Sequence, residues 1–168
     1  RRGMTGSHES STHGKPNVAA PRVLAIASAG GHWEQLRRLS EAFEGCDVRF
    51  ASTNAEVREQ LPPNAKLSIV LDANAWTKFK MAAMMLQVLL LVLRVRPDVI
   101  VTTGAAPGYF AVRFAKLVRA RSLWVDSIAN AEELSRSGRL AKQHATRVAS
   151  QWEHVAERED VLHRGAVL

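Results

Sequence analysis

The sequence Val23-Leu24-Ala25-Ile26-Ala27-Ser28-Ala29-Gly30-Gly31-His32 joins a short apolar run to a glycine pair and a histidine. The five apolar residues are typical of a buried parallel strand, and residues 33–39 continue with the apolar spacing of a helix. A glycine turn between strand and helix lets backbone N–H groups approach an anion closely, and the helix start adds positive potential. We therefore expect Ser28, Gly30 and Gly31 to bind an anionic, phosphorylated ligand.

Strands and helices alternate along the rest of the chain. Further strands are expected at residues 48–52, 67–71, 98–102, 122–126 and 146–150, and helices at 55–61, 77–95 and 109–118, with a turn at 104–108. This alternation predicts the α/β class, with a Rossmann-like doubly wound, mostly parallel sheet. Residues 1–20, rich in Ser, Gly, His and Thr, are interpreted as a disordered lead in which Met4 is a candidate natural start, and residues 21–168 as one domain.

Polar segments follow four of the expected strands. Ligands of doubly wound sheets bind beyond the carboxyl ends of the strands. Many turns between a strand and a helix need glycine only for its backbone geometry, so agreement among several segments says more than one glycine pair. We expect these four segments to converge on one site: Ser28–His32, Thr102–Gly104, Asp126–Ser127 and Ser150–Gln151.

Charge and cysteine content narrow the class of partner. The chain of 168 residues has 23 Lys and Arg against 16 Asp and Glu, a formal charge of +7, which suits phosphorylated substrates or anionic lipid. Nucleic acid is not expected, because no recognition module is evident.

Cys46 is the only cysteine, so the chain can form no internal disulfide. The six histidines show no metal-ligand spacing, and we expect no metal and no cofactor.

One expected helix is apolar around most of its circumference. Residues 81–93 contain one polar residue in thirteen, more apolar than a helix on one side of a sheet needs. The run is shorter than the ~20 residues that span a bilayer, and basic residues flank both of its ends. Either this is a core helix covered on both sides, by the fold or by a partner chain, or its outer face dips into an anionic membrane surface. The residues expected at the membrane are Lys78, Lys80, Leu90, Leu91 and Arg94.

Motifs in order along the chain resemble those of the asparagine-linked glycosylation protein 14 family. Ser28-Ala29-Gly30-Gly31-His32-Trp33-Glu34-Gln35-Leu36 resembles its glycine–histidine motif, and Arg96-Pro97-Asp98-Val99-Ile100-Val101-Thr102-Thr103-Gly104 resembles its second signature. Its third signature is similar to Asp126-Ser127, followed by Ser137-Gly138-Arg139-Leu140 and Ala149-Ser150-Gln151-Trp152-Glu153. The similarity runs from near Pro21 to the C-terminus, most of the chain.

The family resemblance implies one half of a GT-B fold, similar to the N-terminal domain of the MurG-type transferase. This half would be the membrane-associated, acceptor-binding subunit of a split glycosyltransferase, while a separate donor-binding chain would supply the UDP-sugar. The chain has room for one of the two Rossmann-like domains of a GT-B enzyme, which also predicts a partner. Trp33 and Gln35 follow the bacterial form of the first motif, and Asp126 stands where eukaryotic members usually have Glu. We therefore expect a bacterial polysaccharide or exopolysaccharide enzyme, peripheral on the cytoplasmic face of the cell membrane.

The implied reaction transfers a sugar, with inversion, from a UDP-sugar to a hydroxyl of a polyprenyl-diphosphate-linked saccharide. The attacking hydroxyl needs a base, for which His32 is the candidate and Glu34 the rival. The alternative for His32 is to position the ligand without proton transfer. Backbone N–H groups near Gly30 and Gly31 would hold the diphosphate of the acceptor. The residues expected on the acceptor or partner side are Thr103, Gly104, Gly108, Asp126, Ser127, Gln151 and Glu153.

Individual roles follow for some residues of this set. Gly104 and Gly108 are expected to leave room for the acceptor or the partner. Asp126 is expected to orient His32 or bind a sugar hydroxyl, or else to cap the segment that follows it. The family resemblance places Glu153 near the interface with the second domain.

Two other classes of protein remain open. A non-catalytic membrane scaffold that recruits the catalytic glycosyltransferase subunit would share the fold and the charge. A nucleotide-dependent oxidoreductase would share the fold, but no G-x-G-x-x-G follows the first strand. The second strand ends in Ser52-Thr53-Asn54, without the acidic residue that would hold a ribose. The sequence therefore favours the glycosyltransferase subunit over the oxidoreductase.

Overall fold

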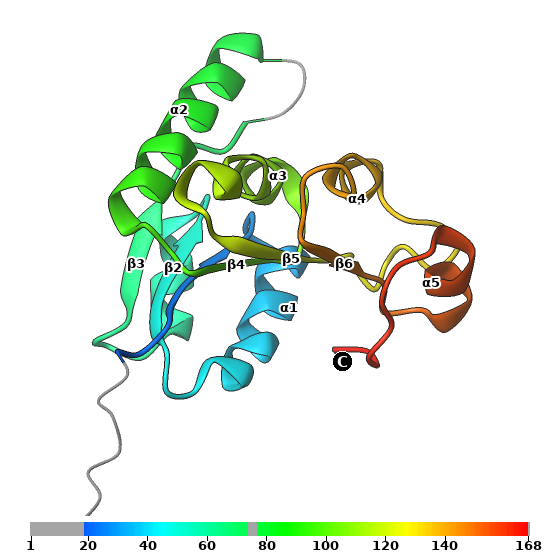
Figure 1. Cartoon of the computed structure of the whole chain (residues 1–168). Coiled ribbons are helices and arrows are strands. Elements are labelled where there is room, and N and C mark those ends of the chain that lie inside the picture. Colours follow the sequence, from blue (N-terminus) through cyan, green and yellow to red (C-terminus); the bar gives the residue numbers. More distant parts are fainter. Residues whose placement is uncertain (1–18, 74–76, 168) are drawn as a thin grey trace, which may run out of the picture.

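The computed structural model describes residues 19–73 and 77–167, so the lead expected at 1–20 lies outside the described residues apart from its last two. Parallel strands form one sheet in the order β3-β2-β1-β4-β5-β6, with helices on both faces (Figure 1). The predicted α/β, doubly wound sheet is confirmed. The strands are β1 (Arg22–Ile26), β2 (Asp47–Ser52), β3 (Lys66–Ile69), β4 (Val99–Thr102), β5 (Arg121–Val125) and β6 (Arg147–Ala149).

Strand β1 lies in the middle of the sheet, between β2 and β4. Successive side chains of a strand point to opposite faces, and here both faces are covered. Leu24 and Ile26 belong to the core on one face, whereas Val23 and Ala25 belong to the core on the other. This burial on both sides explains why the strand is apolar at every position rather than at alternate ones.

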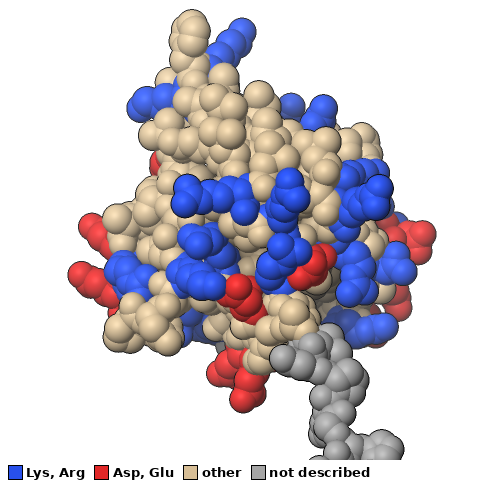
Figure 2. All heavy atoms as spheres, turned by 60° about the vertical axis from the view of Figure 1, so that its left-hand side comes forward, with Lys and Arg blue, Asp and Glu red and all other residues tan. Residues whose placement is uncertain are grey.

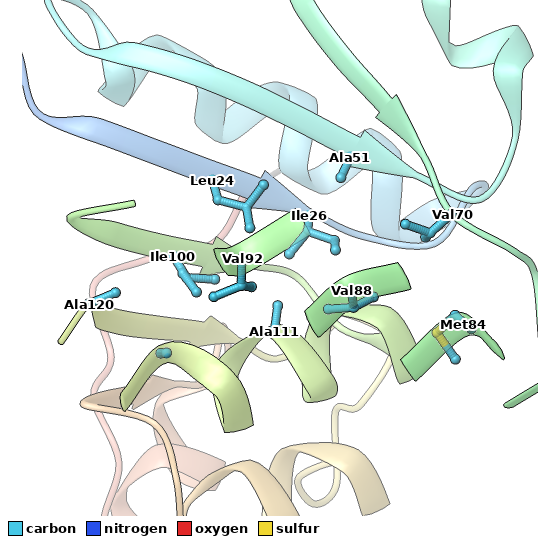
Figure 3. Close-up of a cluster of buried hydrophobic side chains, with 11 residues drawn as sticks. Leu24, Ile26, Ala51, Val70, Met84, Val88, Val92, Ile100, Ala111 and Ala120 are labelled. Carbon is cyan, nitrogen blue, oxygen red and sulfur yellow. The ribbon is translucent and has the colours of Figure 1, made fainter. Parts of the chain in front are cut away.

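The first face of the sheet is covered by α2 (Lys78–Val95), α3 (Ala105–Phe114) and the 3-10 turn η3 (Ala115–Val118). Met84, Val88 and Val92 lie four residues apart on α2, so they share one side of the helix and are fully buried. Figure 3 shows Val88 and Val92 beside the inward side chains of β1 and β4, with Met84 farther along α2.

The second face is covered by α1 (Gly31–Leu39), followed by the 3-10 turns η1 (Ser40–Phe43) and η2 (Ala55–Gln60). Trp33 of α1 packs edge-on against Phe50 of β2, with ring centroids 5.9 Å apart. Its indole N–H donates to the Gln60 side chain at 2.8 Å, so the buried ring keeps its polar atom satisfied. Trp33 thereby fixes α1 on the sheet.

A third apolar cluster closes the β6 end of the sheet. It joins α4 (Arg136–Ala141) and α5 (Glu153–Glu159) to the strands through the buried side chains of Trp124, Val148 and Val155. This packing positions the segments that follow β5 and β6.

The turn expected at 104–108 is wrong, because α3 already begins at Ala105. Pro107 is the third residue of this helix, where a backbone N–H has no partner within the helix and proline is tolerated. The observed helix therefore starts four residues before the expected one. The other expected elements agree with the structure to within two residues at each end.

The outer face of α2 is left uncovered within the described residues. Four exposed apolar side chains of α2 lie along one stripe: Phe79 (94%), Leu86 (54%), Leu90 (56%) and Leu93 (43%). Leu91 lies off this stripe and is half-buried, because it packs in part against the core. None of the helices in the described residues is long and apolar enough to cross a membrane.

Candidate functional site

The carboxyl ends of β1 and β4 lie side by side at the point where the strand order reverses. The chain leaves β1 toward β2 on one side and leaves β4 toward β5 on the other, so no connection covers the space between these two ends. His32, in the first turn of α1, and Thr103, directly after β4, meet there. The structure thus brings together two of the segments that the sequence predicts to converge.

His32 and Thr103 are joined by two hydrogen bonds. The ring Nδ1 of His32 lies 2.9 Å from the carbonyl oxygen of Thr103, and the Thr103 hydroxyl donates back to the carbonyl oxygen of His32. A carbonyl oxygen only accepts, so Nδ1 must carry the hydrogen. In the neutral ring Nε2 then holds a lone pair and can accept a proton. Among the described hydrogen bonds none engages Nε2.

Gly104 makes room for the ring of His32. A Cβ built on Gly104 would lie 2.8 Å from both Cε1 and Nδ1 of that ring, closer than real Cβ contacts allow. Its φ of 131° is also a conformation that favours glycine. The expectation that Gly104 leaves room for an acceptor is therefore wrong: the space is filled from within the chain.

Gly108 has a packing role as well. Its Cβ would lie 2.0 Å from Oγ1 of Thr102, because α3 approaches β4 at this glycine. The Thr102 hydroxyl accepts a hydrogen bond from the backbone N–H of Gly104 at 3.1 Å. Gly108 holds α3 close to β4 and supports the turn at Gly104, rather than leaving room for an acceptor or partner.

The start of α1 is open. Gly30 has a φ of 82° and precedes the helix, no side chain caps the helix, and a Cβ at Gly30 or Gly31 would meet nothing within 4 Å. The first N–H groups of a helix have no partner within it and carry partial positive charge. Ser28 is half-buried just before this turn, and the N–H of Ala29 is held by the Thr53 hydroxyl at 3.1 Å. This end of α1 can accept an anion.

Glu34 faces two arginines. Its carboxylate accepts from Arg37 at 2.6 Å and from Arg38 at 3.2 Å. The hydrogen bond from Arg37, followed by that from Arg38, lowers the pKa of Glu34 below its ordinary value. A carboxylate stabilised in its charged form is a weaker base, so the geometry favours His32 over Glu34 as the proton acceptor.

Gln35 links three of the converging segments, although the sequence analysis gave it no role. Its amide donates to the Ser127 hydroxyl at 3.1 Å, while its carbonyl oxygen accepts from Gln151 at 2.6 Å and from the Ile128 N–H at 3.1 Å. Gln35, Ser127 and Gln151 are all buried. The signal available in the sequence was a polar residue one helical turn after Gly31, within the first motif.

Asp126 organises the loop that follows β5. Its buried carboxylate accepts from the Trp124 indole, from the Asn130 amide, and from both the N–H and the hydroxyl of Ser135. A Cβ on Gly138 would lie 2.6 Å from its Oδ1, so this glycine permits the approach of α4. The expectation that Asp126 orients His32 or binds a sugar hydroxyl is wrong, because its oxygens are engaged within the loop.

Glu153 is the remaining expected residue. It is exposed at the first position of α5, and no described hydrogen bond connects it to His32 or Gln35. Its neighbour Trp152 donates its indole N–H to the carbonyl oxygen of Ile128 at 2.7 Å. Within the described residues, no group of three His, Cys, Asp or Glu side chains could hold a metal ion.

No known protein family and no curated protein matches the sequence, whereas many solved structures share its fold. Acinetobacter baumannii MurG matches with a TM-score of 0.67 and 15% identity, over 80% of this chain and 43% of MurG. The UDP-GlcNAc 2-epimerase of Methanocaldococcus jannaschii matches with a TM-score of 0.63 and 14% identity, over 84% and 43% of the two chains. Anabaena HepE, solved with UDP-glucose, matches with a TM-score of 0.58 and 11% identity, over 88% and 42%.

These likenesses establish a Rossmann-like fold of the kind found in GT-B proteins such as MurG. The chain spans about two fifths of the length of each of these three structures.

Proposed function

We propose that this chain is the acceptor-binding half of a GT-B glycosyltransferase, which transfers a sugar from a UDP-sugar to a polyprenyl-diphosphate-linked saccharide in bacterial polysaccharide biosynthesis. One observation carries the proposal. The hydrogen bond from His32 Nδ1 to the Thr103 carbonyl, 2.9 Å long, leaves Nε2 able to accept a proton beside the open start of α1. A proton acceptor and an anion site therefore lie together at the switch point of the sheet.

In the proposed reaction a hydroxyl of the acceptor attacks the anomeric carbon of the donor sugar. The bond from that carbon to UDP breaks, UDP leaves with the bonding electrons, and the configuration inverts. His32 Nε2 takes the hydroxyl proton as the new bond forms, while Thr103 keeps the ring oriented. A positioned base of this kind contributes about 10²–10⁴-fold to the rate.

The start of α1 would hold the diphosphate of the acceptor. The open backbone at Gly30 and Gly31 can approach phosphate oxygens without a steric barrier. The buried contacts of Gln35 with Ser127 and Gln151 keep α1 fixed relative to β5 and β6. The rigid helix α1 would thus position both the diphosphate and the attacking hydroxyl of the acceptor.

The donor site is assigned to a second Rossmann-like half on a separate chain, which would bring the UDP-sugar. The described residues form one such half, and the site at His32 lies at the carboxyl ends of the central strands β1 and β4. Anabaena HepE was solved with UDP-glucose, which fits a nucleotide-sugar donor. We propose that the two chains form a heteromer that is active only when complete.

The uncovered stripe of α2 is the proposed membrane contact. Phe79, Leu86 and Leu90 would enter the headgroup region, and Lys78, Lys80 and Arg94 would meet anionic lipids. Such contact would place the chain peripherally on the cytoplasmic face of the cell membrane, where a polyprenyl-linked acceptor is embedded.

The test is sugar transfer by the two-chain complex, using a short-chain polyprenyl-diphosphate saccharide as acceptor. We expect His32→Gln to lower kcat by about 10²–10⁴-fold. Glu34→Gln, on the same helical turn, is the matched control and should retain most of the activity. A His32→Gln complex that turns over normally would remove His32 as the base.

A membrane scaffold that only recruits the catalytic subunit is the second candidate, favoured by the uncovered stripe of α2. It predicts that loss of the chain abolishes transfer, whereas His32→Gln leaves transfer unchanged. The same assay therefore separates the two functions.

A further inference from the structure

A hollow of about 610 Å³ lies between α2 and the strands β1, β2 and β3. Arg22, Asp47 and Lys66 line it, and they are the first residues of three adjacent strands. Arg94, near the end of α2, lines its other side. The lining reaches Ile69 at the carboxyl end of the outer strand β3, but it includes neither His32 nor Thr103, so this hollow is separate from the site at β1 and β4.

The lining of the hollow is strongly basic. It contains four cationic side chains and one carboxylate. Arg22 pairs with Asp98, and Lys66 pairs with Asp47, so these two cations are largely neutralised. Arg49 and Arg94 form no ion pair among the described residues, and Arg49 instead donates to the Ser68 hydroxyl at 3.3 Å. Two guanidinium groups therefore remain available to an anion.

One wall of the same hollow is apolar. Leu90 and Leu91 of α2 face Ile69 of β3, and Leu90 and Ile69 are 56% and 45% exposed. Leu90 also belongs to the uncovered stripe of α2, so the apolar wall continues into the proposed membrane contact. Figure 2, which turns this side forward, shows Lys and Arg side chains in a band below a protruding, largely uncharged segment.

We propose that this hollow binds the phosphate headgroup of an anionic phospholipid. Arg49 and Arg94 engage the phosphate, because guanidinium groups bind phosphate oxygens through paired hydrogen bonds. Leu90 and Ile69 cover the first carbons of an acyl chain. A free phosphate would use the arginines but not the apolar wall, so the two linings together select a lipid. This inference rests on the membrane contact proposed above and names the lipid that the contact prefers.

The experiment compares vesicle binding by two double variants of equal charge. Arg49→Gln with Arg94→Gln removes the free guanidinium groups, and Arg136→Gln with Arg147→Gln removes two exposed arginines at the other end of the sheet. We expect the first pair to weaken binding to phosphatidylglycerol-containing vesicles by about tenfold or more. The control pair should change it by less than about threefold, and binding to phosphatidylcholine vesicles should be unchanged in both. If the two double variants lost vesicle binding equally, the attraction would be a diffuse effect of net charge, and the proposed headgroup site would be overturned.

A second arm uses soluble ligands and separates the lipid from free phosphate. Dihexanoyl phosphatidylglycerol should shift the amide resonances of residues around Arg49 and Arg94, and inorganic phosphate should bind at least about tenfold more weakly. Equal binding of the two ligands would overturn the lipid assignment. Thermal unfolding of each variant verifies that it is folded.

A third double variant tests the membrane contact of α2 independently of the headgroup site. Phe79→Glu with Leu86→Glu alters the α2 stripe outside the hollow, so it should abolish vesicle binding but keep binding of the soluble lipid. Vesicle binding that survives this change would remove the membrane contact. Vesicle binding that is lost here, but unaffected by Arg49→Gln with Arg94→Gln, would keep the contact and overturn the headgroup site.

Discussion

The ring of His32 occupies the space that a side chain at Gly104 would need. A Cβ at Gly104 would lie 2.8 Å from Cε1 and Nδ1 of the ring, and Nδ1 is also the atom bonded to the Thr103 carbonyl. The segment after β4 therefore sets the position of the candidate base in the segment after β1. Gly104 and His32 are far apart in the sequence, yet the position of the His32 ring depends directly on the absence of a side chain at Gly104.

Gly104→Ala should displace the His32 ring and break its bond to Thr103. At a φ of 131° the alanine also introduces backbone strain of about 1–3 kcal/mol. We expect ¹⁵N spectra of the imidazole to show Nδ1 protonated in the neutral wild-type ring, and a mixture of tautomers in the variant. Gly45→Ala is the control, because its φ is also positive, at 79°, but its Cβ meets nothing. An unchanged His32 spectrum in Gly104→Ala would contradict this dependence.

Gln35→Ala should destabilise the fold through loss of its buried hydrogen bonds. The change leaves the Ile128 N–H without its acceptor and removes a partner of Gln151. An unsatisfied buried polar group costs about 1–3 kcal/mol, which urea unfolding can measure. The exposed Gln143→Ala should stay within about 0.5 kcal/mol of wild type. Equal stability of the two variants would mean that the Gln35 contacts do not hold α1 to β5 and β6.

The Glu34 ion pairs predict a stability difference that depends on pH. Hydrogen bonds from Arg37 and Arg38 lower the pKa of folded Glu34 from its ordinary value of 4.5. A lowered pKa means that the stabilisation is fully present above that ordinary value and disappears as the pH falls through the folded value. The melting temperature of Glu34→Gln should therefore lie below that of wild type at neutral pH and converge with it in acid. The effect is small, because the carboxylate is 40% exposed. If the difference in melting temperature between wild type and Glu34→Gln grew on acidification, it would contradict the stabilising ion pairs of Glu34.

Two neighbouring leucines of α2 should respond differently to the same substitution. Leu91→Glu places a charge on a half-buried side chain that packs against the core and should lower the free energy of unfolding by about 1–3 kcal/mol. Leu90→Glu changes a side chain that is 56% exposed and should leave the fold intact while weakening binding to anionic vesicles. Thermal unfolding and vesicle flotation measure the two effects. Loss of stability in Leu90→Glu comparable to that in Leu91→Glu would mean that this face is buried.

The sequence was sufficient for the fold, because its signals are local. The unbroken apolar run at 23–27 and the polar segments after later strands follow directly from a buried parallel sheet. The start of α3 was missed because Gly104 and Pro107 look like a turn, although proline is also tolerated in the first turn of a helix.

The roles of single residues depended on contacts between distant segments. Asp126 is a polar residue at the end of a strand, as a ligand-binding carboxylate would be. Its four hydrogen bonds come instead from Trp124 of β5 and from Asn130 and Ser135 of the loop that follows. Gln35 belongs to the first motif, but the motif does not reveal its contacts with Ser127 and Gln151, which form only after folding. Leu91 and Leu90 are identical in type and adjacent, so only the orientation of α2 separates them.

The open turn before α1 is proposed to hold the diphosphate of a polyprenyl-linked acceptor. The most direct measurement is a titration of the ¹⁵N-labelled chain with farnesyl diphosphate, followed through the backbone amides. We predict that the amides of Gly30, Gly31 and His32 shift most, and that farnesyl monophosphate binds more weakly. If the amides at this turn stay unchanged while others shift, or if none shifts, the acceptor site does not lie at the start of α1.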